Sequence, residues 1–252
     1  MAETPKAMLR RWLQEKAAPE AAAWAIPALD ALAASRAERD LHIFLGMAPR
    51  RLGRGALALS AAEIAASDAA RPGWAPARWS LDGAARVLAL LTFRAADRGP
   101  GAFADTFRDL RRTADAAELI ALYRGFPLYP EPETLEPEAG EALRSNLTPV
   151  FEAIAHHNPY PRDHFAEHRW NHMILKAVFV GSALAPIQGL RARANPELAR
   201  MLADYARERW AAGRAVAADL WIPVLPFRDD PAVAAVLARA VATGELTQEA
   251  LT

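Results

Sequence analysis

Alanine occupies 60 of the 252 positions, close to a quarter of the chain, and no other feature restricts the fold as strongly. Alanine has the highest intrinsic propensity for the α-helix and is depleted in β-strands. A chain of this composition is expected to build its core from helices. The sequence therefore predicts an all-α protein.

The apolar residues recur at helical spacing in segments that proline-marked turns separate. The run 82–96 is apolar on nearly every face, which predicts a central helix. Ser60 followed by Glu63 predicts a capping box at the start of another helix, and a further helix is expected at 141–156. We expect an irregular helical bundle or a HEAT-like α-solenoid of stacked antiparallel helices.

The length lies near the upper limit of one ordinary domain, so we expect residues 1–252 to form a single all-α domain. The stretch 126–140, FPLYPEPETLEPEAG, is rich in proline and glutamate. It is the one candidate for an internal boundary and is expected to be a long surface loop.

Charge and composition exclude several classes of protein. Thirty basic residues balance thirty acidic ones, which gives no electrostatic basis for a nucleic-acid partner, and the absence of cysteine excludes disulfides and thiolate metal sites.

The first 16 residues lack the apolar core of a secretory signal, and the apolar run 173–190 is too interrupted to span a membrane. These features predict a cytoplasmic protein. Glycine-rich phosphate-binding motifs and a GxSxG elbow are absent from the sequence, and we expect no cofactor.

Histidine is concentrated in one part of the chain. Five of the six histidines lie within 17 residues: His156, His157, His164, His168 and His172. If His168 and His172 lie on one helix, their i, i+4 spacing allows them to share a metal ion. Glu167 or Asp163 would then supply a carboxylate ligand. The alternative, a hydrogen-bonded or solvated histidine face without metal, is favoured because the sequence has no HExxH motif.

Two further features raise the question of a polar site. Lys176 is one of only three lysines, beside 27 arginines, and it lies within the apolar run MILKAVFVG. It is either a desolvated amine that contacts a phosphate or carbonyl, or a lysine whose head reaches water. The segment Asn158-Pro-Tyr-Pro has a rigid backbone, which either directs Asn158 and His157 toward a pocket or only connects two helices.

Four long stretches carry a resemblance to a known family. They are RPGWAPARWSLDGAARVLALL at 71–91, RTADAAELIALYRGFPLYP at 112–130, NPYPRDHFAEHRWNHMILKAVFVG at 158–181 and RANPELARMLADYARERWAAGR at 193–214. In these stretches the chain resembles the EboA family, small bacterial proteins encoded beside a prenyltransferase-like membrane protein and a sugar-phosphate cyclase-like enzyme. The resemblance covers most of the chain from about residue 50 onwards. It implies a role in making or exporting a secondary metabolite, with scytonemin in cyanobacteria as the known association, and it implies no established reaction.

The resemblance also implies a shared site within the matching stretches. The candidate positions are Asn158, Trp170, Asn171, Lys176, Arg193, Asn195, Tyr205, Glu208 and Arg209. Lys176 and Arg193 would bind an anionic group, and Asn171 and Glu208 would bind hydroxyl groups. The first hypothesis is an accessory protein that binds a small polar or phosphorylated molecule, or another protein of the same pathway, at helices 165–180 and 196–213.

The second hypothesis places an enzyme at the same site, acting on a phosphorylated or sugar-like substrate. His157 or His172 would be the general base, because imidazole titrates near neutral pH. Lys176 would hold the phosphate or act as the electrophilic partner, with Glu208 nearby, and a metal-assisted version would use His168 and His172. A third hypothesis is a helical scaffold that binds no small molecule.

Overall fold

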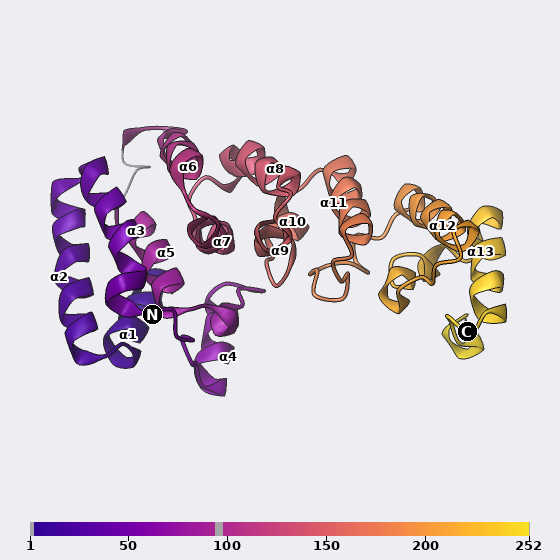
Figure 1. The fold of residues 1–252 in the computed structure, drawn as a ribbon, viewed down its shortest axis with the longest axis horizontal. Helices are drawn as coiled ribbons and strands as arrows, with labels where there is room; N and C mark the ends of the chain where they lie inside the picture. Colours follow the sequence, from indigo (N-terminus) through magenta and orange to yellow (C-terminus); the bar gives the residue numbers. More distant parts are fainter. Residues whose placement is uncertain (1–2, 94–97, 252) are drawn as a thin grey trace. The chain divides into compact units, whose positions relative to one another are not determined.

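The computed structural model describes residues 3–93 and 98–251, and this part of the chain is helical almost throughout (Figure 1). Within it, β-type pairing is limited to one isolated antiparallel bridge between Ala56 and Ser80. The prediction of an all-α fold is confirmed. In the same residues, no helix combines the length and the apolar character that crossing a bilayer requires.

The chain forms two compact units, Met1–Tyr160 and Pro161–Thr252. The first unit contains α1 (Pro5–Lys16), α2 (Pro19–Ser35), α3 (Glu38–Leu52), α4 (Ala61–Ala70), α5 (Leu81–Phe93), α6 (Ala102–Thr113), α7 (Ala116–Arg124), α8 (Glu136–Arg144) and α9 (Thr148–Ala155). The later helices are α10 (Tyr160–His164), α11 (Glu167–Val180), α12 (Pro196–Ala211) and α13 (Pro231–Ala242). The stretch 126–140 lies inside the first unit, and the single-domain description of 1–252 stays a prediction.

Helix α5 forms the centre of the first unit. It packs against α1, α2, α3 and α7, and all of its residues except Leu81 and Leu91 are buried. A helix that is apolar on nearly every face has to be surrounded by other elements, because no face of it is suited to water. The prediction of a central helix at 82–96 is confirmed as far as Phe93, and positions 94–96 lie outside the described residues.

One buried arginine ties this central helix to its neighbours. The side chain of Arg86 on α5 is 2% exposed and forms an ion pair with Asp82 at 3.4 Å. Its Nε donates a hydrogen bond to the carbonyl oxygen of Leu45 on α3, and its guanidinium lies 3.9 Å from the carboxylate of Glu118 on α7. A charge can be buried here because oxygen atoms from three helices surround it.

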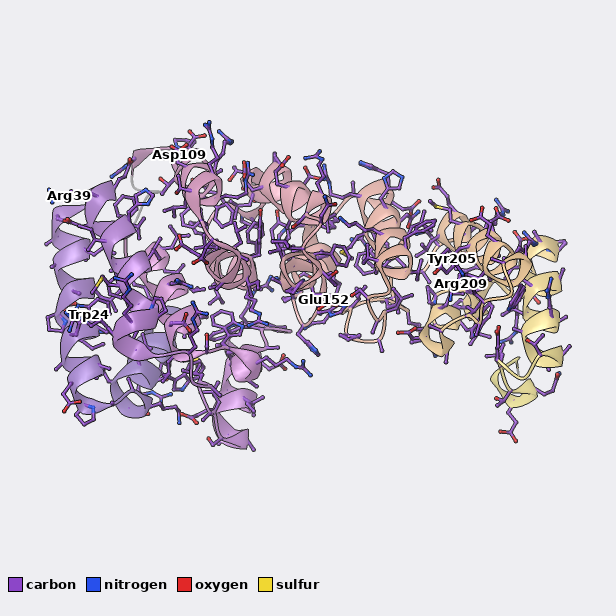
Figure 2. The ribbon with its side chains drawn as sticks, in the orientation of Figure 1. Trp24, Arg39, Asp109, Glu152, Tyr205 and Arg209 are labelled. Atoms are coloured by element: carbon purple, nitrogen blue, oxygen red, sulfur yellow. The ribbon has the colours of Figure 1, made fainter. Side chains whose placement is uncertain are left out.

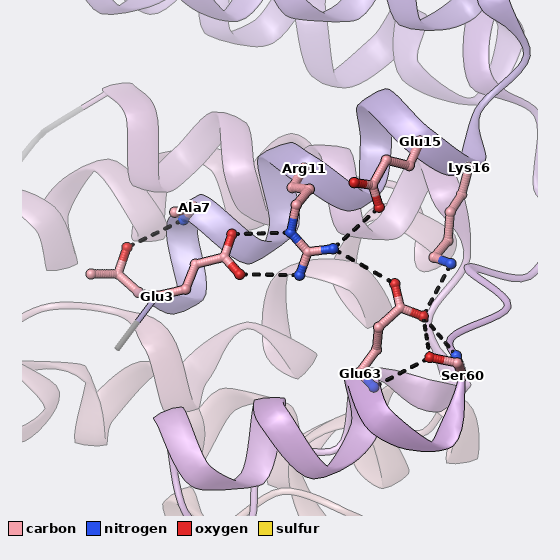
Figure 3. A network of polar contacts seen from close by, with 8 residues as sticks. Glu3, Ala7, Arg11, Glu15, Lys16, Ser60 and Glu63 are labelled. Atoms are coloured by element: carbon pink, nitrogen blue, oxygen red, sulfur yellow. Dashed lines mark hydrogen bonds and ion pairs between the residues drawn. The ribbon is translucent and has the colours of Figure 1, made fainter. Parts of the chain in front are cut away.

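The predicted capping box is present at the start of α4 (Figure 3). The backbone N–H of Ser60 donates to the Glu63 carboxylate at 2.7 Å, and the backbone N–H of Glu63 donates to the Ser60 hydroxyl oxygen at 3.3 Å. The same carboxylate pairs with Lys16 of α1 at 3.1 Å, while Arg11 of α1 pairs with Glu3 at 3.0 Å. The cap that starts α4 is therefore also a point of attachment to α1.

The stretch 126–140 is not the surface loop that its composition suggests. It contains two short 3₁₀ helices, Phe126–Leu128 and Pro132–Leu135, followed by the first half of α8. Phe126, Tyr129 and Leu135 are buried, and the Tyr129 hydroxyl donates to the carbonyl oxygen of Leu122 at 3.0 Å. A proline lies in the first turn of each of these helices, while the apolar residues between the prolines pack into the core.

The expected continuous helix at 141–156 is also wrong. Helix α8 ends at Arg144, and α9 begins at Thr148 with Pro149 in its first turn. Proline lacks a backbone N–H, and its ring clashes with the carbonyl group four residues earlier, so it is favoured in the first turn of a helix and costly in its interior.

Helix α12 is central to the second unit, where it packs against α11 and α13. Leu198, Leu202 and Ala206 form its buried face. The rings of Trp210 and Trp221 stack with their centroids 6.1 Å apart. The second unit thus has an apolar core of its own.

Candidate functional site

The two asparagines that were predicted as ligand-binding residues of the second unit form a pair with each other. Asn171 on α11 and Asn195 exchange side-chain hydrogen bonds of 3.2 and 2.8 Å, and both residues are buried. The side-chain oxygen of Asn195 also accepts a hydrogen bond from the backbone N–H of Leu198, which caps α12. Asn171 and Asn195 therefore join α11 to the start of α12.

Arg193 is engaged in a similar way. Its guanidinium donates to the carbonyl oxygens of Pro161 at 2.8 Å, Arg162 at 3.2 Å and Phe165 at 2.7 Å. It also lies over the indole ring of Trp170, 4.8 Å from the ring centroid. Burial lowers the pKa of Arg193. These contacts make Arg193 a clamp on the carbonyl groups around α10.

Tyr205 and Arg209, both on α12, lie beside two cavities of the second unit, of about 350 and 240 Å³ (Figure 2). The Tyr205 hydroxyl donates to the carbonyl oxygen of Val178 at 2.9 Å, and Arg209 donates to the carbonyl oxygen of Ala215. The exposed Glu208 lines the smaller cavity. Lys176 is half-buried on α11, and burial lowers its pKa. A ligand-binding role for these residues stays a prediction.

The five histidines are divided between the two units. His164 lies on α10, so it does not continue the face of His168 and His172, which are exposed on α11 with ring centroids 6.4 Å apart. Across residues 3–93 and 98–251, no group of three or more histidine, aspartate or glutamate side chains is arranged to hold a metal ion. A metal bound by His168 and His172 would thus lack a third side-chain ligand of these types from the described part of the chain.

The other two histidines lie at a cavity of the first unit, with a volume of about 130 Å³. It is lined by Trp74, Ala75, Arg78, Trp79, Ile120, Arg124, Pro149, Glu152, Ala153, His156, His157 and Asn158. Three elements build it: the 3₁₀ helix Pro76–Arg78, the C-terminal end of α7, and α9 with the residues that follow it. Glu152, labelled in Figure 2, belongs to α9.

Positive charge dominates the electrostatics of this cavity. Burial lowers the pKa of Arg124, and the neighbouring guanidinium of Arg78 lowers it further. Burial also lowers the pKa of His157, and the nearby Arg78, His156 and Arg124 act in the same direction. In the described part of the chain, neither Arg78 nor Arg124 forms an ion pair with a carboxylate, and Arg124 donates one long hydrogen bond of 3.4 Å to the carbonyl oxygen of Arg78.

Aromatic rings form another wall of the cavity. Trp74 and Trp79 are 2% and 5% exposed, and their ring centroids lie 6.0 Å apart. The indole N–H of Trp74 is buried and has no hydrogen-bond acceptor in the structure. The apolar rings of Trp74 and Trp79 form a low-dielectric wall beside the half-buried Arg124, where solvent screens its charge less than at the exposed Arg78.

Asn158 holds the backbone next to His157 in place by hydrogen bonds of its side chain. Its side-chain amide donates to the carbonyl oxygens of Tyr123 and Ala153, and its side-chain oxygen accepts from the backbone N–H of Tyr160. The preceding residue, His157, has a left-handed backbone with φ +50°. Asn158 is thus a positioning residue that holds His157 at the cavity.

Only part of this cavity was predicted from the sequence. His157 and Asn158 were among the predicted site residues, whereas Arg78 and Arg124, which contribute the positive charge of the cavity, were not. Both arginines lie in stretches that carry the family resemblance, next to tryptophan and tyrosine residues. The sequence feature that could have pointed to the two arginines is their position at the end of a helix, beside an aromatic residue. Local spacing could not connect them, because they lie 46 positions apart.

His157 belongs to the first unit, whereas His172, Lys176 and Glu208 belong to the second. The described residues of each unit therefore contain only part of the predicted catalytic set. What the first-unit cavity provides is a pair of guanidinium groups, an imidazole and aromatic walls, a combination suited to holding an anion.

Comparison with known proteins gives one match. No curated protein matches the chain, and no solved structure matches it either. A family model described as the metabolite traffic protein EboA matches residues 5–225, which includes residues 5–40 and extends beyond the stretches that carry the resemblance. This match covers far more than half of the sequence, and the chain therefore belongs to the EboA family.

Proposed function

We propose that this protein is an accessory protein that binds a small anionic metabolite, and that the binding site is the cavity of the first unit lined by Arg78, Arg124 and His157. The metabolite traffic description of the family agrees with a binding role. As part of the same proposal, the protein acts in the cytoplasm, in a pathway that makes or exports a secondary metabolite. Phosphate or a phosphate ester is the anion that fits best, because it is small and accepts several hydrogen bonds from guanidinium groups.

The observation that carries the proposal is the uncompensated pair of guanidinium groups. Arg124 is half-buried, and the positive charge of the exposed Arg78 lowers its pKa. Glu152 also lines this cavity, and within the described residues neither arginine forms an ion pair with a carboxylate. Placing like charges together costs free energy unless a ligand of opposite charge binds there. In the second unit, by contrast, Arg193 and Arg209 already donate to backbone carbonyl groups.

Calorimetric titration of the full chain with inorganic phosphate, sulfate and glycerol phosphate tests the proposal. Arg78→Gln is expected to weaken binding by about tenfold or more, because a hydrogen bond to a charged group contributes about 1.5–3 kcal/mol. Arg39→Gln is the matched control: Arg39 is an exposed arginine on α3, it does not line the cavity, and its loss changes the net charge equally (Figure 2). Absence of binding by all three anions would contradict the proposal, as would equal losses in the two variants.

A further inference from the structure

A second cavity, of about 160 Å³, lies beside the first in the same unit. It is lined by Arg54, Trp79, Ser80, Asp82, Gly83, Ala117, Ile120, Ala121 and Arg124. Trp79, Ile120 and Arg124 line both cavities, so the two cavities are neighbours that share these three side chains. A molecule bound in the first cavity has the second as its nearest neighbouring space.

The walls of the second cavity are mainly apolar. Ala117, Ile120 and Ala121 are at positions i, i+3 and i+4 of α7, so they share one face of that helix. Gly83 on α5 lies opposite and presents no side chain. A methyl group at Gly83 would lie 3.0 Å from the Ser80 hydroxyl oxygen, which is tighter than ordinary contact.

Two polar residues of this cavity, Ser80 and Asp82, are already paired within the protein, whereas Arg54 and Arg124 bring charged side chains to its lining. The Ser80 hydroxyl donates to Asp82 at 2.6 Å and accepts from the backbone N–H of Gly83 at 3.2 Å. The second carboxylate oxygen of Asp82 pairs with the buried Arg86 at 3.4 Å. Ser80 and Asp82 thus have their main hydrogen-bonding capacity engaged, and the second cavity favours an apolar group.

We infer that the ligand is an amphiphile, with a phosphate-like head in the first cavity beside Arg78 and Arg124 and a short apolar chain that passes Ile120 into the second cavity. This inference rests on the proposed function and specifies its substrate class. A cavity of about 150 Å³ accommodates a benzene molecule, so the second cavity has room for a chain of roughly four to six carbons. Arg124 lines both spaces and would lie where head and chain meet.

A series of alkyl phosphates tests the inference on the full chain by calorimetry. Methyl, butyl and hexyl phosphate carry the same phosphate monoester head and differ only in the chain, and inorganic phosphate reports on binding of an anion without a carbon chain. Affinity is expected to rise by up to about fourfold for each buried methylene and then to level off once the second cavity is full. In parallel, the methyl protons of Ile120 are expected to show nuclear Overhauser contacts to the chain of bound butyl phosphate.

Ala117→Leu fills the second cavity from a half-buried position that does not line the first. This variant is expected to abolish the dependence on chain length and to keep the affinity for inorganic phosphate. Ala116→Leu is the matched control, because Ala116 is exposed on the same helix and lines neither cavity.

The outcomes separate the two proposals. If phosphate binds but chain length has no effect in the unmodified protein, the amphiphile is ruled out and the anion site stands. If the chain-length effect survives in Ala117→Leu, the chain lies elsewhere and the inference is overturned. If none of the phosphates binds, the proposed function itself fails. The Ile120 contacts are measured in the unmodified protein, so the inference stays testable even if a variant fails to fold.

Discussion

At the scale of single residues, His157 has an unusual backbone conformation and an unusual environment. Its φ of +50° lies in the left-handed region, which is uncommon for residues other than glycine, although histidine, asparagine and aspartate adopt it more often than the rest. Asn158 holds the adjoining turn by three hydrogen bonds. Conformational strain of this kind persists where surrounding structure enforces it, and here it keeps an imidazole beside Arg78 and Arg124.

The environment of His157 allows a testable prediction about the protonation of its imidazole. Burial and nearby positive charge lower the pKa of His157, so the imidazole is neutral at neutral pH while the cavity holds no anion. A bound anion stabilises the protonated imidazole and is therefore expected to raise the pKa of His157. Because protonation and anion binding favour each other, the affinity for the anion is expected to rise as the pH falls through this pKa. Sulfate is the suitable probe, because its charge stays constant between pH 5 and 8. Histidine NMR titration with and without sulfate measures the change, and His157→Asn, which tolerates the left-handed backbone, assigns the signal.

An unchanged His157 pKa at saturating sulfate would contradict this prediction. The empty protein offers a second check, on stability. Because the folded pKa lies below the unfolded value of about 6.5, protonation favours the unfolded chain, so stability is expected to fall as pH drops below about 6.5. His157→Asn should remove that part of the pH dependence.

At the scale of elements, local chemistry determined where several helices begin. The capping box of Ser60 and Glu63 and the Asn195 cap of α12 act within three or four residues, and the sequence predicted both. Pro149 carried the same kind of local information about the start of α9. Apolar residues at helical spacing continue across it, and this continuity led to the wrong prediction of one helix. Pro149 is thus the better guide to the start of α9, although α2 and α3 continue through Pro27 and Pro49.

The cap of α4 allows a prediction in acid. Its hydrogen bonds from Ser60, together with Lys16, hold the pKa of Glu63 at about 2. A folded pKa below the unfolded value means that this carboxylate stabilises the protein above about pH 4.5, and that the stabilisation is lost as pH falls toward 2. Glu63→Gln is expected to flatten this part of the stability profile.

The capping serine can be tested at neutral pH. Ser60→Ala is expected to cost about 1 kcal/mol, measured by urea unfolding. Ser35→Ala is the control, because Ser35 ends α2 and has no role in capping α4. Equal effects of the two substitutions would show that the capping box contributes no specific stability.

The cavity itself was beyond prediction from local patterns. Its charged wall comes from the segment after α4, the end of α7 and the residues after α9, and only the packing of these elements brings Arg78, Arg124 and His157 together. Asn171, Asn195 and Arg193 were predicted to bind a ligand, as polar groups beside apolar helices. In the structure they hydrogen-bond to each other or to the backbone, and a ligand-binding role for them stays a prediction. A polar residue in a core-facing position indicates a hydrogen bond, and sequence alone does not say whether the partner is the protein or a ligand.

At the scale of the whole molecule, the two compact units each bury an apolar core of their own. We expect calorimetry of the full chain to resolve two unfolding transitions. Arg193→Lys removes the guanidinium that hydrogen-bonds to three carbonyl groups of the second unit. The substitution is expected to lower the free energy of unfolding of that unit by about 2 kcal/mol and its transition temperature by about 10 °C. Ser60→Ala should lower the other. A single transition shifted by both variants would contradict independent unfolding of the units.

The tryptophans of the first unit have one more consequence. Trp74 and Trp79 line the cavity of the first unit that we propose binds an anion, and the ring of Trp12 lies 5.6 Å from that of Trp74. Indole fluorescence depends on local polarity, and excitation passes readily between rings at such distances. Occupancy of the cavity is therefore expected to change the ultraviolet emission of the protein, so that its ligand can be sought by screening compounds against an optical signal that needs no added dye.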